Sequence, residues 1–132
     1  MPPVDSFRTE SRFHADAGEL SEVRAMVREI PDEVRDDACL LLTELFTNSV
    51  RHSGIHPDEL IRVVVNWTDS SLRVDVFDVP HAKLFPRLPV RRPATGAASG
   101  WGLYLVDRLA TKWGCSLGHC WFEMSPVAVA PA

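Results

Sequence analysis

The stretch from Asp37 to Gly54 constrains the fold most, because it shows one clear helical period. Small and apolar side chains recur at the spacing of one helix face: Ala38, Leu41, Leu42, Leu45 and Ser49. Glu44 and Asn48 are four residues apart, so they stack one turn apart along an edge of this face. A carboxylate and a carboxamide at the border of a core can contact a ligand. A solvated helix flank is the alternative for this pattern.

Composition is typical of a soluble globular protein. The 132 residues include 45% hydrophobic and 24% charged side chains, and the length suits one domain with a core of its own. No apolar run reaches the roughly 18 residues of a membrane span, and the N-terminus lacks the features of a secretory signal. We therefore expect a cytoplasmic protein without membrane contact. Its cysteines, Cys39, Cys115 and Cys120, are expected to be free thiols.

Charge argues against direct nucleic-acid binding, because the net charge is −4. Acidic residues are absent between Asp78 and Asp107. The lysine and arginine residues of that interval are Lys83, Arg87, Arg91 and Arg92. A locally positive segment in an acidic domain suits a phosphate-bearing ligand, and an ordinary solvated loop is the alternative.

The first half of the chain predicts one strand and two helices. Residues 6–13 alternate loosely, as in an edge strand, and Asp16 with Glu19 resembles a capping box. The buried face of a first helix is marked by Leu20, Val23, Val27 and Ile30. Asp32 is the expected N-cap of the second helix, which runs to about His52.

A hairpin follows, with strands at 60–67 and 72–79 joined by turn residues at 69–71. Asp78 has the same parity as the apolar residues of the second strand, so it is expected to face the core. Burying an unpaired carboxylate is costly. Either a donor within the chain or a ligand must therefore satisfy Asp78.

Residues 80–99 are rich in proline and small residues, which predicts a lid, a binding loop or disorder. A third helical pattern follows at Gly102, Leu105, Val106, Leu109 and Trp113. Gly100 and Gly102 open this helix, where backbone N–H groups can approach a phosphate; a flexible hinge is the alternative. Residues 120–124 predict a last strand and 125–132 a frayed tail.

Three motifs in this order resemble the GHKL ATPase module, or Bergerat fold, of histidine kinases, gyrase, Hsp90 and MutL-type proteins. They are Glu44-x-x-x-Asn48, the strand ending at Asp78, and Gly100-x-Gly102-Leu103. The phrases Leu-Leu-Thr-Glu-Leu-Phe-Thr-Asn-Ser-Val-Arg-His and Gly-Trp-Gly-Leu-Tyr-Leu-Val-Asp most resemble small anti-sigma-factor serine/threonine kinases. The resemblance covers about residues 10–124 of a single expected domain spanning 1–132, with 80–99 as an ATP-lid-like loop.

The resemblance implies an α+β two-layer sandwich, in which a mixed, mainly antiparallel sheet has about three helices packed on one face. It also implies ATP and Mg²⁺ as cofactors. By position, Asn48 is the Mg²⁺ ligand, Glu44 the general base, and Asp78 the acceptor for the adenine amino group. The residues that match the phosphate-side loop are Gly100, Gly102 and Leu103.

The chain departs from the family pattern after the aspartate. The usual Asp-x-Gly-x-Gly reads Asp78-Val-Pro80-His-Ala82. Proline fixes φ and removes a donor, so the adenine-side turn is expected to differ. From the length of 132 residues we also expect neither the phospho-accepting helix of a histidine kinase nor the transducer domain of a topoisomerase subunit.

The resemblance implies a regulator that phosphorylates a serine or threonine of an anti-anti-sigma protein and so controls a sigma factor; family members often form homodimers. Two alternatives remain open, namely a non-catalytic nucleotide-binding module and a nucleotide-free partner-switching domain. A metal enzyme is disfavoured. Gly54 interrupts the helix between His52 and His56, and Cys115 and Cys120 lack the usual zinc spacing.

Overall fold

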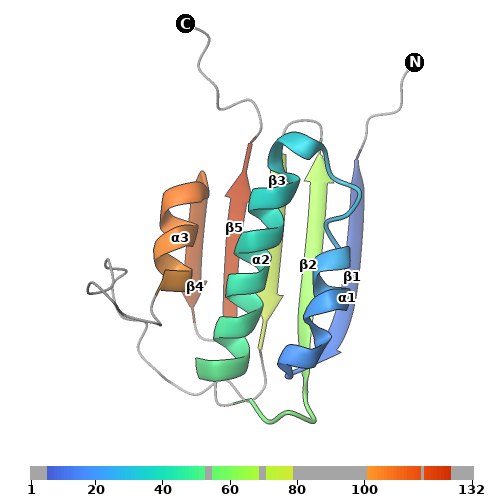
Figure 1. Cartoon of the computed structure of the whole chain (residues 1–132), viewed down its shortest axis with the longest axis vertical. Helices are drawn as coiled ribbons and strands as arrows, with labels where there is room; N and C mark the ends of the chain where they lie inside the picture. Colours follow the sequence, from blue (N-terminus) through green and yellow to red (C-terminus); the bar gives the residue numbers. More distant parts are fainter. Residues whose placement is uncertain (1–5, 53–54, 69–70, 79–100, 117, 126–132) are drawn as a thin grey trace, which may run out of the picture.

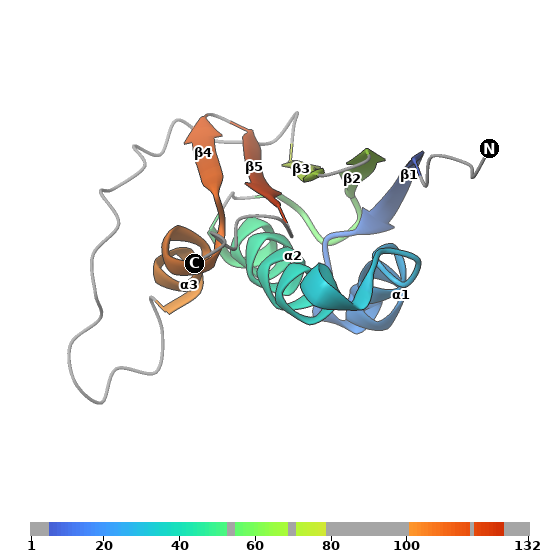
Figure 2. The same ribbon diagram turned by 90° about the horizontal axis from the view of Figure 1, so that it is seen from above.

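A computed structural model describes residues 6–52, 55–68, 71–78, 101–116 and 118–125. These residues form two layers, a five-stranded sheet and a layer of helices on one of its faces (Figures 1 and 2). This is the α+β two-layer sandwich that the sequence predicts. The strand order is β1-β2-β3-β5-β4. Every neighbouring pair is antiparallel, so the sheet is more uniform than the mixed sheet expected.

The elements follow one another along the chain in a simple order. The strands are β1 (Phe7–His14), β2 (Leu60–Thr68), β3 (Ser71–Phe77), β4 (Lys112–Ser116) and β5 (His119–Met124). The helices are the short 3₁₀ helix η1 (Ala17–Glu19), α1 (Leu20–Ala25), α2 (Asp32–His52) and α3 (Trp101–Leu109). None of these helices is long and apolar enough to cross a membrane.

β2 and β3 form the antiparallel hairpin that the sequence predicts, and they are the second and third strands in the order of the sheet. The core-facing residues of this hairpin lie opposite one another in the pairs Val63–Val76, Val65–Val74 and Trp67–Leu72. All six side chains are buried, because the alternation of each strand directs them to the face that the helices cover. β1 pairs with the outer side of β2, which confirms the edge strand expected near the N-terminus.

Helix α2 is the central helix and contacts β3, β5 and α3. Its predicted stripe, Ala38, Leu41, Leu42, Leu45 and Ser49, is buried throughout. Phe46 is also fully buried and meets Phe13 of β1 edge-on, with ring centroids 6.1 Å apart. The prediction of Asp32 as N-cap is wrong by one residue. The Pro31 carbonyl accepts the first helical bond, from Arg35 N–H at 3.0 Å, so Asp32 is already inside the helix.

The predicted capping box takes another form. Asp16 Oδ1 accepts from Gly18 N–H at 3.1 Å, whereas Glu19 Oε1 accepts from His14 N–H at 3.3 Å instead of from Asp16. The first helix is also shorter than its apolar pattern suggested. α1 ends at Ala25, and 3₁₀-type bonds continue the chain as far as Ile30, which keeps the pattern buried without an α-helix.

The third predicted helix is shorter than its sequence pattern suggested. α3 ends at Leu109, and Trp113 lies in β4. The last helical bond runs from Ala110 N–H to the Val106 carbonyl, and Thr111 N–H already donates to Glu123 of β5. Trp113 still packs against the same core and donates from Nε1 to Asp107 Oδ1 at 2.9 Å. Its apolar side chain therefore continued the helical spacing although the backbone had changed to a strand.

The prediction of free thiols is wrong for two of the three cysteines. Cys115 and Cys120 form a disulfide between β4 and β5, with Cα atoms 4.1 Å apart. The antiparallel register places the two residues directly opposite each other, and this pairing is not visible without β4. Cys39 on α2 is free and half-buried.

Candidate functional site

Glu44 and Asn48 lie in the C-terminal half of α2, one helical turn apart. Both are half-buried, and they flank Leu45, which is fully buried. Neither side chain makes a hydrogen bond or ion pair with another residue in the described ranges. Their oxygen atoms are therefore free to contact a ligand at the border of the helix layer.

Asp78 follows the last residue of β3 and is 1% exposed, which confirms its predicted core-facing position. Its backbone N–H donates to the Gly118 carbonyl at 2.9 Å. The side-chain Oδ1 has no hydrogen-bond partner within the part of the chain that the structure describes. A buried polar atom without a partner is rare and costly. A donor within the described chain thus does not satisfy Oδ1, and this atom can accept from a ligand.

The sheet and helices bring these groups to one end of the molecule. The C-terminal end of α2 and the end of β3 lie toward the bottom of Figure 1, and α3 begins beside the lower half of α2. α2 contacts both β3 and α3, so the three elements are neighbours in space although they are far apart in sequence. Gly100 and the predicted lid at 80–99, with Pro80, lie outside the described residues.

The start of α3 contains the residues of the predicted phosphate-side loop that lie within the described ranges. Gly102 is in its first turn, and Leu103 is half-buried and packs against the core. The first N–H groups of any helix have no partner within the helix, and the helix dipole favours an anion there. No acidic residue occupies the first turn of α3. No negatively charged side chain in that turn therefore repels a phosphate.

The donor set around Asn48 suits Mg²⁺ only together with a ligand. No group of three or more histidine, cysteine, aspartate or glutamate residues that could hold a metal ion occurs in the described ranges. The carboxamide oxygen of Asn48 is a hard donor of the kind that Mg²⁺ accepts, and Mg²⁺ commonly takes its other ligands from phosphates and water. The carboxamide of Asn48 thus fits a Mg²⁺ that is bound together with a nucleotide.

Gly118 is a supporting residue that the sequence reasoning missed. It precedes β5, has φ of 76°, and is buried. This left-handed conformation favours glycine, and it directs the Gly118 carbonyl at the N–H of Asp78. The glycine shortly before the predicted last strand was the available signal, but its use required recognition of the β4–β5 hairpin.

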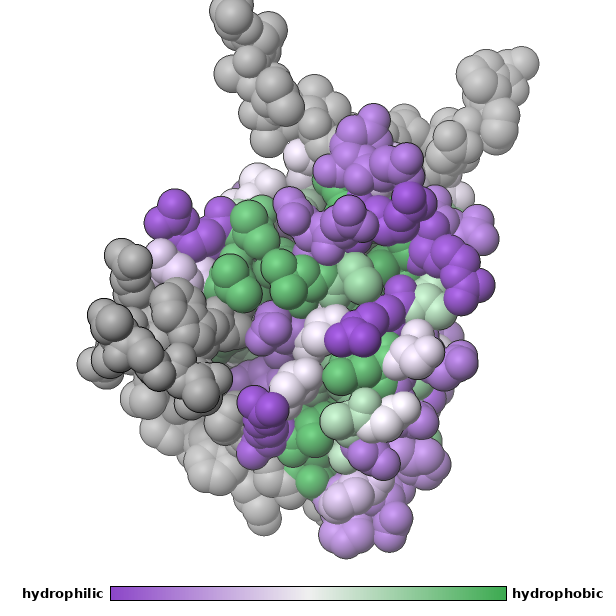
Figure 3. Space-filling view, in the orientation of Figure 1, coloured by the Kyte–Doolittle hydropathy of each residue, from purple (hydrophilic) through white to green (hydrophobic). Residues whose placement is uncertain are grey.

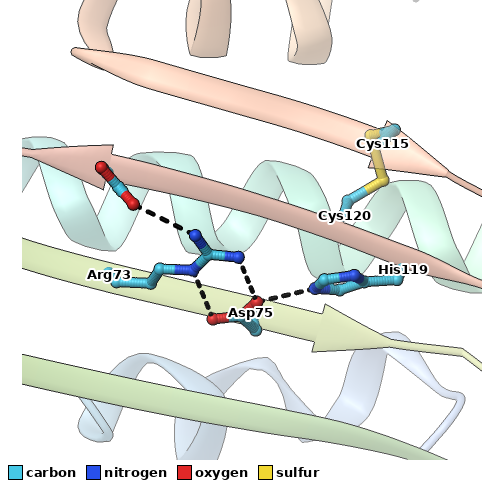
Figure 4. Close-up of polar contacts among 6 residues, drawn as sticks. Arg73, Asp75, Cys115, His119 and Cys120 are labelled. Carbon is cyan, nitrogen blue, oxygen red and sulfur yellow. Dashed lines mark hydrogen bonds and ion pairs between the residues drawn. A yellow bond between two sulfur atoms is a disulfide. The ribbon is translucent and has the colours of Figure 1, made fainter.

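The opposite face of the sheet carries a polar network that is separate from this site (Figure 4). Asp75 accepts from Arg73 through two N–H groups at 3.0 Å, and its Oδ2 lies 2.7 Å from His119 Nε2. Burial disfavours the charged carboxylate, but the hydrogen bonds from Arg73 and His119 outweigh it and lower the pKa of Asp75. The side chain of Arg73 also covers the ring of Trp121 at 4.2 Å.

The helix-bearing face, in contrast, gathers hydrophobic side chains between charged ones (Figure 3). The large hydrophobic residues exposed on the described parts of α2 and α3 are Leu40 and Leu109, at 38% and 37%. Single exposed leucines are ordinary on a protein surface. They do not by themselves indicate a binding site.

Comparisons with known proteins agree with this architecture. A model of the histidine kinase-like ATPase domain family matches residues 13–116. The chain is also similar to the crystal structure of the RsbU and RsbW domains of Rv1364c from Mycobacterium tuberculosis, with a TM-score of 0.62 and 16% identity. That alignment covers 90% of this chain and 32% of the other, so the present chain spans about a third of that protein. A comparison with curated protein sequences gives no significant match.

At 16% identity, the structural likeness establishes the shared fold. The family match extends over most of the chain and includes Glu44, Asn48 and Asp78. Nucleotide binding is the property that such an ATPase domain implies. The chain therefore belongs to the histidine kinase-like ATPase domain family.

Proposed function

We propose that this protein is an ATP- and Mg²⁺-binding regulator that phosphorylates a serine or threonine of a protein partner. The observation that carries the proposal is the buried Oδ1 of Asp78, which has no partner in the described chain. The motif resemblance implies that this carboxylate binds adenine. An adenine amino group supplies the N–H donor that this oxygen lacks. Family membership, shown by the match over residues 13–116, supports the same ligand.

The remaining roles are proposed from the motif resemblance, and the positions of these residues on α2 and α3 support them. Asn48 would hold Mg²⁺, which supplies charge neutralisation at the phosphates. Gly102 and Leu103 would direct backbone N–H groups at the phosphates from the first turn of α3. Glu44 would accept the proton of the attacking hydroxyl, because its free, half-buried carboxylate stands one turn before Asn48.

The proposed partner is an anti-anti-sigma protein, and the proposed outcome is release or retention of a sigma factor. The motif resemblance to small anti-sigma-factor kinases supports this assignment, as does the fold shared with a structure that contains an RsbW domain. A cytoplasmic location belongs to the same proposal. The net charge of −4 fits control through a protein partner better than contact with nucleic acid.

A second candidate function is a nucleotide-dependent partner switch without catalysis. Pro80 and Ala82, which replace the usual glycines after Asp78, favour it. Loss of backbone freedom at this turn would alter how the nucleotide is held. Phosphotransfer to an anti-anti-sigma protein from labelled ATP separates the two candidates, because only the kinase transfers the label.

Calorimetric titration with ATP, with and without Mg²⁺, tests the nucleotide site. The wild type is expected to bind more tightly with Mg²⁺, Asp78→Ala to lose binding under both conditions, and Asn48→Ala to lose the effect of Mg²⁺. Asn66→Ala is the matched control, because Asn66 is an exposed carboxamide on β2 and faces away from the helices. Absence of ATP binding by the folded wild type would overturn both candidate functions.

A further inference from the structure

We propose that Cys115 and Cys120 form a reversible thiol–disulfide site that sets the position of Asp78 and, through it, the affinity for nucleotide. The affinity part of this inference rests on the proposed function. The effect on Asp78 itself rests on the geometry of the β4–β5 hairpin alone.

The two cysteines are placed for reversible chemistry. They lie directly opposite each other in the antiparallel pair β4–β5 and are joined across it (Figure 4). Cys120 is 2% exposed, whereas Cys115 is half-buried on β4, which among the described strands pairs with β5 alone. An external thiolate therefore approaches the Cys115 sulfur more readily than the Cys120 sulfur.

A short path leads from this disulfide to the candidate site. Cys120 lies opposite Val76 in the pairing of β5 with β3, and His119 lies opposite Phe77. The next residue back along the chain, Gly118, accepts the hydrogen bond from Asp78 N–H at 2.9 Å. The turn that the disulfide closes is thus the turn that holds the backbone of Asp78.

The disulfide acts locally because it closes a short loop. The cysteines are separated by five positions, and a bridge over so short a loop restricts the unfolded chain less than one over a long loop. In the folded protein, it fixes the edge strand β4 to β5 beside the Gly118 turn. Without the bridge, hydrogen bonds and side-chain packing alone hold this edge, and local opening of the turn becomes easier.

The reaction is a two-electron exchange with a dithiol of the thioredoxin class. One thiolate of the dithiol attacks Cys115 Sγ, the S–S bond to Cys120 breaks, and Cys120 leaves as a thiolate that takes up a proton. The second thiol of the reductant then displaces Cys115 as a thiol. The protein gains two electrons and two protons, and the reductant becomes its own disulfide. Oxidation of the two thiols by a disulfide reverses these steps.

The test compares the wild type in its oxidised form with protein reduced by dithiothreitol. Exchange of the Asp78 amide proton, followed by NMR, reports the Gly118 hydrogen bond directly. Calorimetry with ATP and Mg²⁺ reports affinity. Reduction is expected to speed exchange of the Asp78 amide proton. It is also expected to weaken ATP binding about fivefold, which corresponds to the loss of one hydrogen bond that holds the site in place.

Two variants provide controls. Cys39→Ser keeps the disulfide and removes the free thiol of α2, so it should retain the full difference between the two forms. The double variant Cys115→Ser/Cys120→Ser should resemble the reduced wild type and ignore dithiothreitol. A redox response that survives in the double variant would overturn the assignment to this pair.

The other outcomes are also decisive. Equal exchange at Asp78 and equal affinity in both forms would overturn the inference and leave the proposed function intact. Faster exchange after reduction, with no ATP binding in either form, would support the link from disulfide to Asp78 and overturn the proposed function. Alkylation of all three cysteines in the oxidised protein would show that no disulfide forms, which would also overturn the inference.

Discussion

Asp75 on β3 and His119 on β5 contact each other on the face of the sheet opposite the helices, with Oδ2 of the carboxylate 2.7 Å from Nε2 of the imidazole. Arg73 binds the same carboxylate, so Asp75 is held by two neighbours. Burial opposes its ionisation, but these hydrogen bonds prevail and the pKa of Asp75 is lowered in the folded state. A lowered pKa means that the carboxylate stabilises the fold above its unfolded-state pKa of about 3.9 and loses this effect as pH falls through its folded-state pKa.

Asp75→Asn is therefore expected to lower the free energy of unfolding at pH 7 by about 1–3 kcal/mol, because it weakens charged hydrogen bonds to Arg73 and His119. The loss should shrink as the pH falls below about 4, where Asp75 of the unfolded wild-type chain takes up a proton, and should vanish once the pH lies below the lowered folded-state pKa. Urea unfolding at pH 7 and near pH 3 measures both effects. Asp58→Asn is the control, because the Asp58 side chain is 90% exposed. An equal loss for Asp75→Asn at both pH values would contradict the prediction.

Gly114→Ala should destabilise the β4–β5 hairpin. A Cβ atom at Gly114 would lie 2.9 Å from Nε1 of Trp121, and the Trp121 ring is covered by Arg73. Overpacking of this kind costs about 1–3 kcal/mol. Thermal unfolding should show a lower Tm for Gly114→Ala, whereas Gly18→Ala should stay near wild type because its closest contact is an ordinary 3.6 Å. Equal Tm values for the two variants would show that the ring moves aside freely.

Asp78→Ala should cost little stability in the absence of nucleotide. The substitution removes a buried carboxylate oxygen that has no partner in the described chain, so the change in unfolding free energy should stay within about 1 kcal/mol. Val76→Ala, in the same buried row of β3, should cost about 2 kcal/mol through lost apolar burial. Urea unfolding of the ligand-free proteins compares them. A large loss for Asp78→Ala would indicate that the carboxylate supports the fold.

Glu44→Gln should separate catalysis from binding. It keeps the size of the side chain but removes its basicity, so phosphotransfer to the partner should fall about 10²–10⁴-fold. ATP affinity should change little, because the proposed role of Glu44 is toward the hydroxyl group. Steady-state transfer assays and calorimetry test the two parts. Glu33→Gln, in the exposed first turn of α2, is the control. A transfer rate equal to that of wild type would remove Glu44 from the proposed mechanism.

Much of the fold follows from local patterns. The apolar stripe of α2 and the alternation of β2 and β3 are reliable predictors of structure. An apolar side chain that departed from either pattern would face solvent and not the core. The core-facing position of Asp78 was predictable for the same reason, because it has the parity of the apolar residues of β3. β4 was not, since it is short, contains Gly114 at its middle, and has Trp113 at a spacing that also fits a helix.

Contacts between strands that are distant in sequence could not be predicted in this way. The bond from Asp78 to Gly118, the contact between Asp75 and His119, and the disulfide all depend on β5 lying beside β3 and β4. Alternation gives the face of a residue but not its neighbour across the sheet. The start of α2 also differs from the prediction by one residue, because the residue type at this position does not reveal the N-cap. Pro31 occupies the N-cap position of α2, where its carbonyl accepts the first helical hydrogen bond from Arg35 N–H, and any residue type has such a carbonyl.

The strand order also determines how the sheet meets other chains. β1 and β4 are outermost among the strands of the described residues, and an outer strand exposes N–H and C=O groups that can pair with a strand of another molecule. Arg8 and Arg12 are exposed along β1, and exposed Lys112 begins β4. Positive charges on both margins oppose the continuous strand-to-strand stacking that leads to aggregates. Both outer strands of the described sheet thus carry charged side chains that disfavour unspecific pairing with another chain.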